Sequence, residues 1–63
     1  MESGQDVRAS DRERELVVER LTRAVGQGRL SLEEFDSRVA AAHAAVTRAE
    51  LAALTRDLPG RLW

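Results

Sequence analysis

Three closely spaced carboxylates are the first residues whose types and spacing suggest chemistry. Glu33, Glu34 and Asp36 follow Ser31 near the middle of the chain. Paired carboxylates can hold a divalent cation or act as general acid and base. The pattern around Ser31 indicates a helix start, where acidic side chains compensate the positive end of the helix dipole. We therefore interpret these carboxylates as capping and dipole compensation, and predict no metal site there.

The other side chains that could react are isolated from one another. The sequence has no cysteine and one histidine, His43, with no second metal ligand three or four positions away on either side. The hydroxyls of Ser10, Ser31 and Thr47 each precede a glutamate by three positions, a spacing typical of helix caps rather than nucleophiles. The sequence therefore predicts no catalytic, cofactor-binding or metal-binding residues, and a protein that is not an enzyme.

A short glycine pattern, Gly26-Gln27-Gly28, resembles the start of a phosphate-binding loop. Such a loop needs a preceding strand, and the residues before Gly26 have a helical period instead. We interpret the two glycines as a helix C-terminus and a turn.

Three repeats of one capping pattern divide the chain into helices. In a capping box, a Ser or Thr N-cap and a Glu three residues later each satisfy a backbone N–H of the other. The three pairs are Ser10 with Glu13, Ser31 with Glu34, and Thr47 with Glu50. Each box precedes apolar residues spaced three and four apart; Gly26 and Gly28 end the first segment, and Pro59-Gly60 ends the third. The sequence predicts an all-α fold, a small three-helix domain with short turns, with helices over 11–26, 32–46 and from Thr47 to about residue 58.

The apolar positions of these helices predict one core. Leu30 and Phe35 flank the second capping box at the positions of a hydrophobic staple, and Val46 and Leu51 flank the third. The expected core comprises Val17, Leu21, Val25, Leu30, Leu32, Phe35, Val39, Ala42, Val46, Leu51, Leu54 and Leu58.

The charged residues are nearly balanced. Ten basic residues, all arginine, oppose eleven acidic ones in 63 residues, for a formal net charge of -1. This balance lacks the positive excess that phosphate binding requires, so nucleic acid is not an expected partner. Within the second helix, Glu34 and Arg38 have the i,i+4 spacing of a helical ion pair.

Length and hydropathy predict a single small domain. Residues 1–9 are expected to be a flexible leader, 10–60 the helical domain and 61–63 a tail. No apolar run reaches the roughly 18 residues that span a bilayer, so we expect no membrane insertion by this segment. The expected location is the cytoplasm, or the cytoplasmic side of a membrane if a longer parent protein is anchored there.

A combination of short motifs between Arg8 and Pro59 resembles a known family. The motifs are Arg8-Ala9-Ser10-Asp11, Arg12-Glu13, Gly28-Arg29-Leu30, Leu32-Glu33-Glu34-Phe35-Asp36, Arg38, Ala41-Ala42, Thr47, Glu50-Leu51 and Asp57-Leu58-Pro59. With these, the chain resembles the actinobacterial SHOCT-like family catalogued as domain of unknown function 1707. The resemblance implies a module near the N-terminus of a longer protein, with no reaction attributed to it. Related SHOCT modules are thought to mediate oligomerisation or protein contact.

An alanine-rich run from Ala40 to Ala45 is the feature that helix propensity explains least completely. Small side chains around a helix allow a second helix to approach closely. Trp63 packs over the apolar edge of Leu54 and Leu58, buries itself in a second copy, or leads into a following segment. The possible interface residues are Leu16, Ala41, Ala44, Ala45 and Trp63.

These observations favour a non-catalytic helical interaction or oligomerisation module, with a regulatory or scaffolding role as an N-terminal domain. Its expected partner is a protein, either a second copy or a downstream domain. The alternative is a small helix-turn-helix DNA-binding domain, suggested by Arg48 and Arg56 on the third helix.

Overall fold

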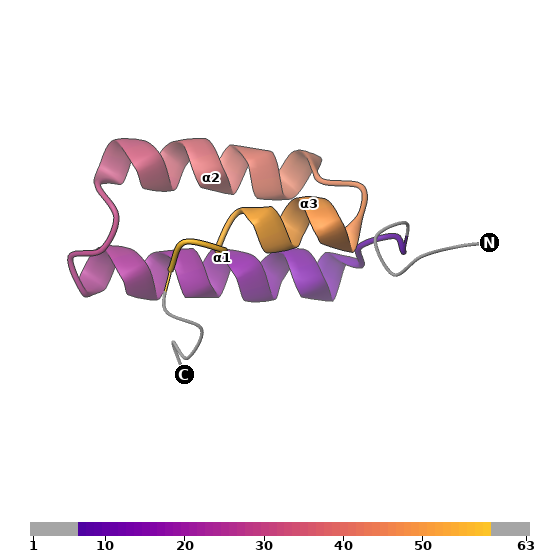
Figure 1. The fold of residues 1–63 in the computed structure, drawn as a ribbon, viewed down its shortest axis with the longest axis horizontal. Helices are drawn as coiled ribbons and strands as arrows, with labels where there is room; N and C mark the ends of the chain where they lie inside the picture. The colour runs from indigo at the N-terminus through magenta and orange to yellow at the C-terminus, as the bar shows by residue number, and fades with distance from the viewer. Residues whose placement is uncertain (1–6, 59–63) are drawn as a thin grey trace.

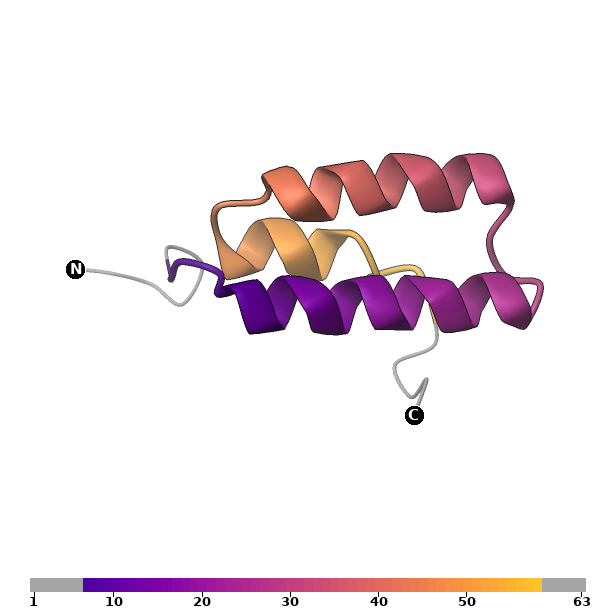
Figure 2. The same ribbon diagram turned by 180° about the vertical axis from the view of Figure 1, so that it is seen from behind.

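The computed structural model describes residues 7–58, which fold into three helices. The helices are α1 (Asp11–Gly26), α2 (Leu32–Ala44) and α3 (Arg48–Ala53). α1 and α2 form an antiparallel hairpin, and α3 lies along the seam between them at the end where α2 connects to α3 (Figures 1 and 2). The predicted all-α, three-helix fold is confirmed. Within residues 7–58, no helix combines the length and apolar character needed to cross a bilayer.

All three helices begin with a complete capping box. The Ser10 Oγ accepts from the Glu13 N–H at 3.1 Å, and a Glu13 carboxylate oxygen accepts from the Ser10 N–H at 2.9 Å. The same reciprocal pair joins Ser31 and Glu34. It also joins Thr47 and Glu50. Local side-chain chemistry therefore fixes where each helix starts.

α1 ends in a Schellman turn around Gly28. The Gly28 N–H donates to the Val25 carbonyl at 3.0 Å and the Arg29 N–H donates to the Ala24 carbonyl at 2.8 Å. Gly28 has a φ of 76°, a left-handed conformation in which glycine has no Cβ to clash. This turn directs the chain into the N-cap of α2.

The other two helices end earlier than the sequence predicted. α2 stops at Ala44 rather than residue 46, because Ala45 is already extended and the chain must enter the extended N-cap Thr47. α3 stops at Ala53 rather than near residue 58. From there the amides of Leu54, Thr55 and Leu58 donate to carbonyls three residues back. These tighter i→i+3 bonds replace the last predicted turn of helix.

The core consists of two clusters joined along α1. One cluster contains the fully buried Leu21 and Ala24 with Leu30 and Leu58, and the half-buried Val17, Val25, Phe35 and Val39 pack against it. The other contains Ala42, Ala45 and Leu51, with Leu54, Ala9, Val17 and Val18 packed against it. Val17 belongs to both sets, so α1 connects the two halves of the core.

Two residues expected in the core lie outside it. Leu32 is 69% exposed and Val46 is 46% exposed. Leu32 opens α2 at the end of the hairpin that α3 does not cover (Figure 1). Val46 follows Ala45 in an extended segment, where successive side chains point to opposite sides, so Ala45 enters the core and Val46 faces out.

Part of the predicted leader is tied to the α2–α3 connection. The Ala9 N–H donates to the Val46 carbonyl at 2.8 Å, and the Arg48 N–H donates to the Val7 carbonyl at 2.9 Å. An isolated antiparallel bridge between Arg8 and Thr47 results. Within the described residues, hydrogen-bonded structure thus begins at Val7, four residues before α1. The remainder of the leader, 1–6, and the tail, 61–63, lie outside the described residues.

Candidate interaction groove

An open groove of about 440 Å³ runs between α1 and α3. We call it the α1/α3 groove. It is lined by Glu13, Leu16, Val17, Glu19, Arg20, Arg23, Arg48, Leu51, Ala52 and Thr55. Its position follows from the fold, because α3 is a short helix laid against a longer one and leaves one side of α1 uncovered (Figure 2).

The floor of the groove is apolar. Leu51 is buried between the helices, Val17 is half-buried, and Ala52 adds a small exposed side chain on α3. Leu16 stands at the side of the groove and is 45% exposed. The sequence singled out Leu16 as an exposed, possible interface residue, and the structure places it at this site. A floor of this kind gains free energy by excluding water when a second apolar surface covers it.

An ion pair joins the two walls at the N-terminal end of α1. The Glu13 Oε2 accepts a hydrogen bond from the Arg48 Nε at 2.6 Å, and the Arg48 Nη2 lies 2.6 Å from the same oxygen in an ion pair. This pairing lowers the pKa of Glu13 below its ordinary value of 4.5, with the Arg48 hydrogen bond the largest cause and the Ser10 backbone N–H the next. The same contact raises the pKa of Arg48. Glu13 therefore serves two purposes: it caps α1 and holds the first turn of α3 against it.

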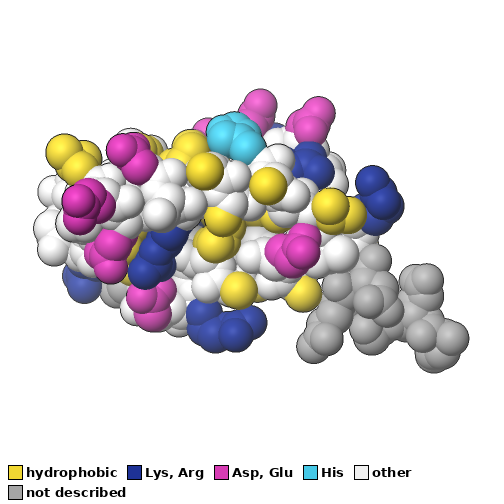
Figure 3. Space-filling view, turned by 90° about the horizontal axis from the view of Figure 1, so that it is seen from above, with side chains coloured by type: hydrophobic (Ala, Val, Ile, Leu, Met, Phe, Trp, Pro, Cys, Tyr) yellow, Lys and Arg dark blue, Asp and Glu magenta, His cyan; other side chains and the backbone are white. Residues whose placement is uncertain are grey.

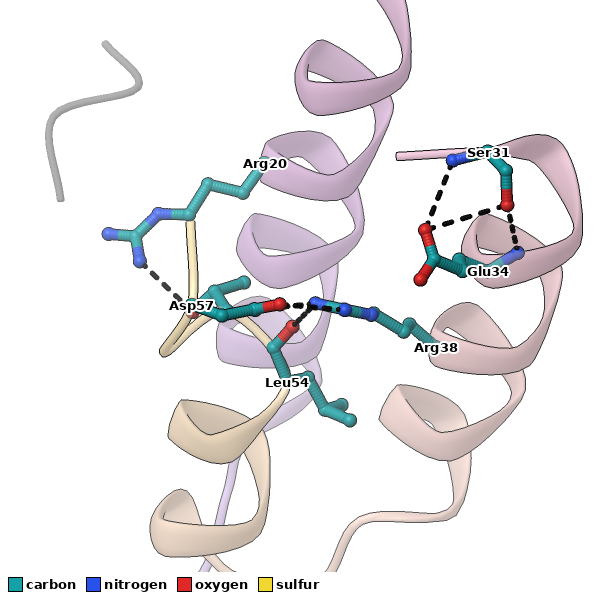
Figure 4. Close-up of polar contacts among 7 residues, drawn as sticks. Arg20, Ser31, Glu34, Arg38, Leu54 and Asp57 are labelled. Atoms are coloured by element: carbon teal, nitrogen blue, oxygen red, sulfur yellow. Dashed lines mark hydrogen bonds and ion pairs between the residues drawn. The ribbon is translucent and has the colours of Figure 1, made fainter. Parts of the chain in front are cut away.

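Arginines line the other end of the groove. Arg20 extends from α1 toward the turn that follows α3 (Figure 4). Its Nη1 donates to the Thr55 Oγ1 at 3.4 Å. Thr55 is the buried polar residue of the described chain, and this contact satisfies its hydroxyl. Arg23 lies one helical turn beyond Arg20 along the same wall. The groove thus has an apolar floor, the ion pair of Glu13 and Arg48 at one end, and Arg20 and Arg23 together with Glu19 at the other.

Arg38 extends from α2 and holds the C-terminal end of α3 in place. Its guanidinium donates to both carboxylate oxygens of Asp57, at 2.8 and 3.0 Å, and to the Leu54 carbonyl at 2.9 Å (Figure 4). The hydrogen bonds with Asp57 raise the pKa of Arg38 and lower that of Asp57. The predicted ion pair between Arg38 and Glu34 is wrong, because Glu34 turns back into its own capping box.

A second arginine caps the end of α2. The Arg14 Nε donates to the carbonyl of Ala45, the C-cap residue, at 3.1 Å, and its Nη1 donates to Asp11 at 2.8 Å. Carbonyl groups at a helix C-terminus lack intrahelical partners, so a cation there is stabilising. Arg14 and Arg38 together close the C-terminal ends of α2 and α3, and thereby fix the position of the α3 wall of the groove.

The side chains that the sequence considered for metal chemistry do not form a metal site. His43 is exposed and shares a shallow pocket of about 250 Å³ with Glu15, Val18 and Glu19. Glu33 and Asp36 are exposed on α2. Across residues 7–58 no group of three or more His, Cys, Asp or Glu side chains is placed to hold a metal ion.

The predicted interface residues fall in three different environments. Leu16 lines the groove, whereas Ala41 and Ala44 are exposed on α2. Ala45 is 5% exposed and belongs to the core, so its assignment to an interface is wrong. Its extended backbone at the end of α2 directs the methyl group inward. Trp63 lies outside the described residues.

The sequence did not identify the arginines or the α3 wall as parts of one surface. Leu16, Arg20 and Arg23 have spacings of four and three, which place them on one face of α1. That periodicity could have indicated a mixed apolar and basic face. The approach of Leu51, Ala52 and Thr55 to that face could not be predicted, because it depends on how α3 packs.

Comparison with known proteins identifies relatives of the chain. The family model described as DUF1707 SHOCT-like domain matches residues 7–59. Two uncharacterized proteins of Mycobacterium tuberculosis, one from each of two strains, are each 45% identical to the chain over 56 residues. The match covers 89% of this chain but 28% of each relative, so the chain spans little more than a quarter of their length. No solved structure matches the chain.

Proposed function

Because the chain belongs to the family of DUF1707 SHOCT-like domains, we propose that it is a non-catalytic protein-interaction module whose contact surface is the α1/α3 groove. The observation that carries this proposal is the exposed Leu16 beside an apolar floor formed by Val17 and Leu51. Proteins commonly bind an amphipathic helix in a groove of this kind, with apolar anchors on the floor and charged residues at the rim.

The chemistry of the lining supports binding rather than reaction. The one hydroxyl in the lining belongs to Thr55, which is buried and hydrogen-bonded to Arg20. The carboxylate of Glu13 is held by Arg48, with its pKa lowered, so it is a poor proton donor near neutral pH. Since this chain corresponds to 28% of its relatives, a regulatory or scaffolding role beside other domains is part of the proposal.

The structure offers less support for the DNA-binding alternative. α3 spans Arg48–Ala53 and is shorter than a typical recognition helix. Arg48, one of the two arginines that suggested this reading, is engaged by Glu13 at 2.6 Å. Arg56 follows the helix rather than lying on it. Salt-dependent binding of the domain to duplex DNA would favour the alternative again.

Site-specific photocrosslinking in the intact protein tests the proposal. A diazirine amino acid placed at Ala52 lies in the groove, and the same residue at the adjacent exposed Ala53 is a matched control. We expect irradiation in cells to give a discrete protein adduct from position 52 and much less from position 53. Adding Leu16→Glu should abolish the adduct, because it places a charge over the apolar floor.

Mass spectrometry of the adduct identifies the protein bound in the groove. Equal crosslinking from positions 52 and 53, or no protein adduct from position 52, would contradict the proposal. Circular dichroism of the Leu16→Glu variant provides the folding control, because the half-exposed Leu16 contributes little to the core.

A further inference from the structure

The residues before α1 make a backbone contact with the start of α3. We call residues 7–9 the strap. The Ala9 N–H donates to the Val46 carbonyl at 2.8 Å, and the Arg48 N–H donates to the Val7 carbonyl at 2.9 Å. Arg48 is the first residue of α3, and a helix offers no partner to an N–H at that position. The strap therefore supplies a hydrogen bond that α3 cannot make within itself.

We propose that the strap regulates the α1/α3 groove. While the strap is paired, it holds α3 in the position that forms one wall of the groove; when it unpairs, that wall loosens and the groove loses its shape. This inference rests on the proposed function and names the regulation of the same site. It is argued from two links between the strap and the groove, and from the size of α3.

Arg48 is the first link, because the strap and the groove hold it from two sides. Its N–H is bound by the Val7 carbonyl, and its guanidinium, which lines the groove, pairs with Glu13 at 2.6 Å. The Glu13 carboxylate also accepts from the N–H of Ser10, the residue that follows the strap. The strap, the cap of α1 and the first turn of α3 are thereby joined at one end of the groove.

A shared apolar cluster is the second link. Ala9 is half-buried and packs against the cluster of Ala42, Ala45 and Leu51. Leu51 is also the buried residue in the floor of the groove. Withdrawal of the strap therefore uncovers the cluster that contains the floor, in addition to breaking the two hydrogen bonds.

The size of α3 makes it dependent on these contacts. It spans Arg48–Ala53, and a helix of six residues is not stable in water without tertiary contacts. Arg38 anchors its C-terminal end through the Leu54 carbonyl. Loss of the strap therefore leaves that end held and loosens the end where Arg48 meets Glu13.

The coupling between the strap and the groove is reciprocal. If pairing of the strap favours the groove, a protein bound in the groove favours pairing of the strap by the same factor. A segment that competes with the strap for the Val46 carbonyl or the Arg48 N–H weakens binding in the groove, although it lies outside the groove lining.

A pair of proline substitutions tests the inference. Ala9→Pro removes the N–H that donates to Val46, whereas Arg8→Pro, one position away, keeps both hydrogen bonds, because neither uses the Arg8 N–H. Amide hydrogen exchange in α3 should be about five- to tenfold faster in Ala9→Pro, the factor for about one net hydrogen bond, and unchanged in Arg8→Pro. Equal exchange in the two variants would overturn the inference.

The α1–α2 turn is the internal reference for the exchange measurement. It lies at the opposite end of the molecule from the strap (Figure 1). Charged and apolar side chains are interspersed on the surface seen between these two ends (Figure 3). Its exchange rates should be the same in the parent and in both proline variants.

A titration reports on the groove itself. The hydrogen bond from Arg48 is the largest cause of the lowered pKa of Glu13, and Arg8 is not among its causes. We expect an NMR titration to show the pKa of Glu13 rising toward its ordinary value of 4.5 in Ala9→Pro and keeping the parent value in Arg8→Pro. An unchanged pKa in a folded Ala9→Pro protein would show that the strap does not act on the groove.

A reversible lock makes the test independent of whether Ala9→Pro folds. Arg8 and Thr47 lie opposite each other in an antiparallel pair whose hydrogen bonds come from the flanking residues, and the Cα separation of about 4.5 Å in such pairs suits a disulfide. The chain has no cysteine, so Arg8→Cys with Thr47→Cys gives a single possible bond.

The oxidised and reduced forms of this double variant are then compared, and both lack the Thr47 cap. We expect α3 to exchange about five- to tenfold more slowly in the oxidised form, because the strap cannot leave. Equal exchange in the two forms would overturn the inference.

Photocrosslinking from position 52 separates this inference from the proposed function. A protein adduct that Ala9→Pro weakens and Arg8→Pro leaves intact supports both. An adduct of equal yield in the parent and in Ala9→Pro supports the proposed function and overturns control by the strap. Absence of an adduct in the parent contradicts the proposed function, and the exchange of the locked protein still decides whether the strap holds the α3 wall.

Discussion

The α1–α2 turn and the surroundings of α3 are held by contacts of different range. At the turn, Gly28 closes α1 and the box of Ser31 and Glu34 opens α2, all within a few residues. Around α3, Arg38 reaches from α2 to Leu54 and Asp57, which lie 16 and 19 residues away along the chain. The first region therefore forms from adjacent residues, whereas the second exists only when the helices have already assembled.

The largest effect is expected at Leu21, which serves both regions. It is fully buried in one cluster with Leu30 from the turn and Leu58 from the segment after α3. Leu21→Ala should cost about 2–5 kcal/mol, a large part of the stability of a domain this small. A circular dichroism melt should show loss of the cooperative transition. Leu16→Ala is the control, because Leu16 lies on the same helix but is half-exposed, and this variant should melt like the parent. Identical melts for the two variants would show that Leu21 does not join the two regions.

A smaller and more local effect is expected from Arg38→Met. Methionine keeps the apolar stem but removes the donors to Leu54 and Asp57. The cost should be about 1–3 kcal/mol, the range for hydrogen bonds to charged groups, reduced because Asp57 is largely exposed. Amide hydrogen exchange should accelerate in α3 while the α1–α2 turn keeps its protection. Equal acceleration in both regions would show that they are not separable; Arg56→Met is the matched control.

The turn can be tested with a pair of glycine substitutions. Gly28→Ala forces a Cβ into a left-handed residue and should cost about 1–2 kcal/mol. Gly26→Ala, in the last turn of α1 and with no heavy atom near the added Cβ, should instead stabilise by about 0.4–1 kcal/mol. Chemical denaturation of the two variants measures the difference. Opposite signs are expected, and a shared sign would contradict the Schellman turn.

The smallest effect on the stability of the fold is expected from lowering the pH. The pKa values of Glu13, Glu50 and Asp57 are lowered, chiefly by Arg48, by the Val46 N–H and by Arg38 respectively. A carboxyl group whose pKa is lower in the folded state stabilises the fold at pH values above its unfolded pKa, which is 4.5 for the glutamates and 3.8 for Asp57. That stabilisation is lost as the pH falls through the pKa of the folded state.

Stability should therefore be level near neutrality and fall below about pH 4.5, first around α3, where all three carboxyl groups make their contacts. Denaturant unfolding between pH 7 and 2.5 measures this dependence. The Glu13→Gln variant should show a shallower decline, since its side chain no longer titrates. A decline as steep as that of the parent would show that the contact with Arg48 does not contribute.

The same difference in the range of contacts explains why the sequence predicted the helix starts but not the ends of α2 and α3 or the groove. The helix starts depend on side chains three residues apart, and Ser10, Ser31 and Thr47 all cap the predicted helices. The ends of α2 and α3 were placed too late, because Arg14 and Arg38 bind their last carbonyls from other helices. The groove was missed for the same reason: Leu16 was identified as exposed, but its α3 wall depends on packing.

The bridge between Arg8 and Thr47 has a consequence for the order of events in folding. Its hydrogen bond from Ala9 to Val46 joins residues 37 positions apart, whereas the turn at Gly28 closes a loop of a few residues. Loop-closure entropy rises with the logarithm of loop length, so the hairpin of α1 and α2 is expected to form early and the bridge late. Because the bridge consists of two backbone hydrogen bonds outside the helices, we expect it to open in the native state more readily than the helical hairpin does. The chain that precedes Val7 is therefore expected to be held beside the α2–α3 connection when the bridge is closed and to be released when it opens, while the helical hairpin stays intact.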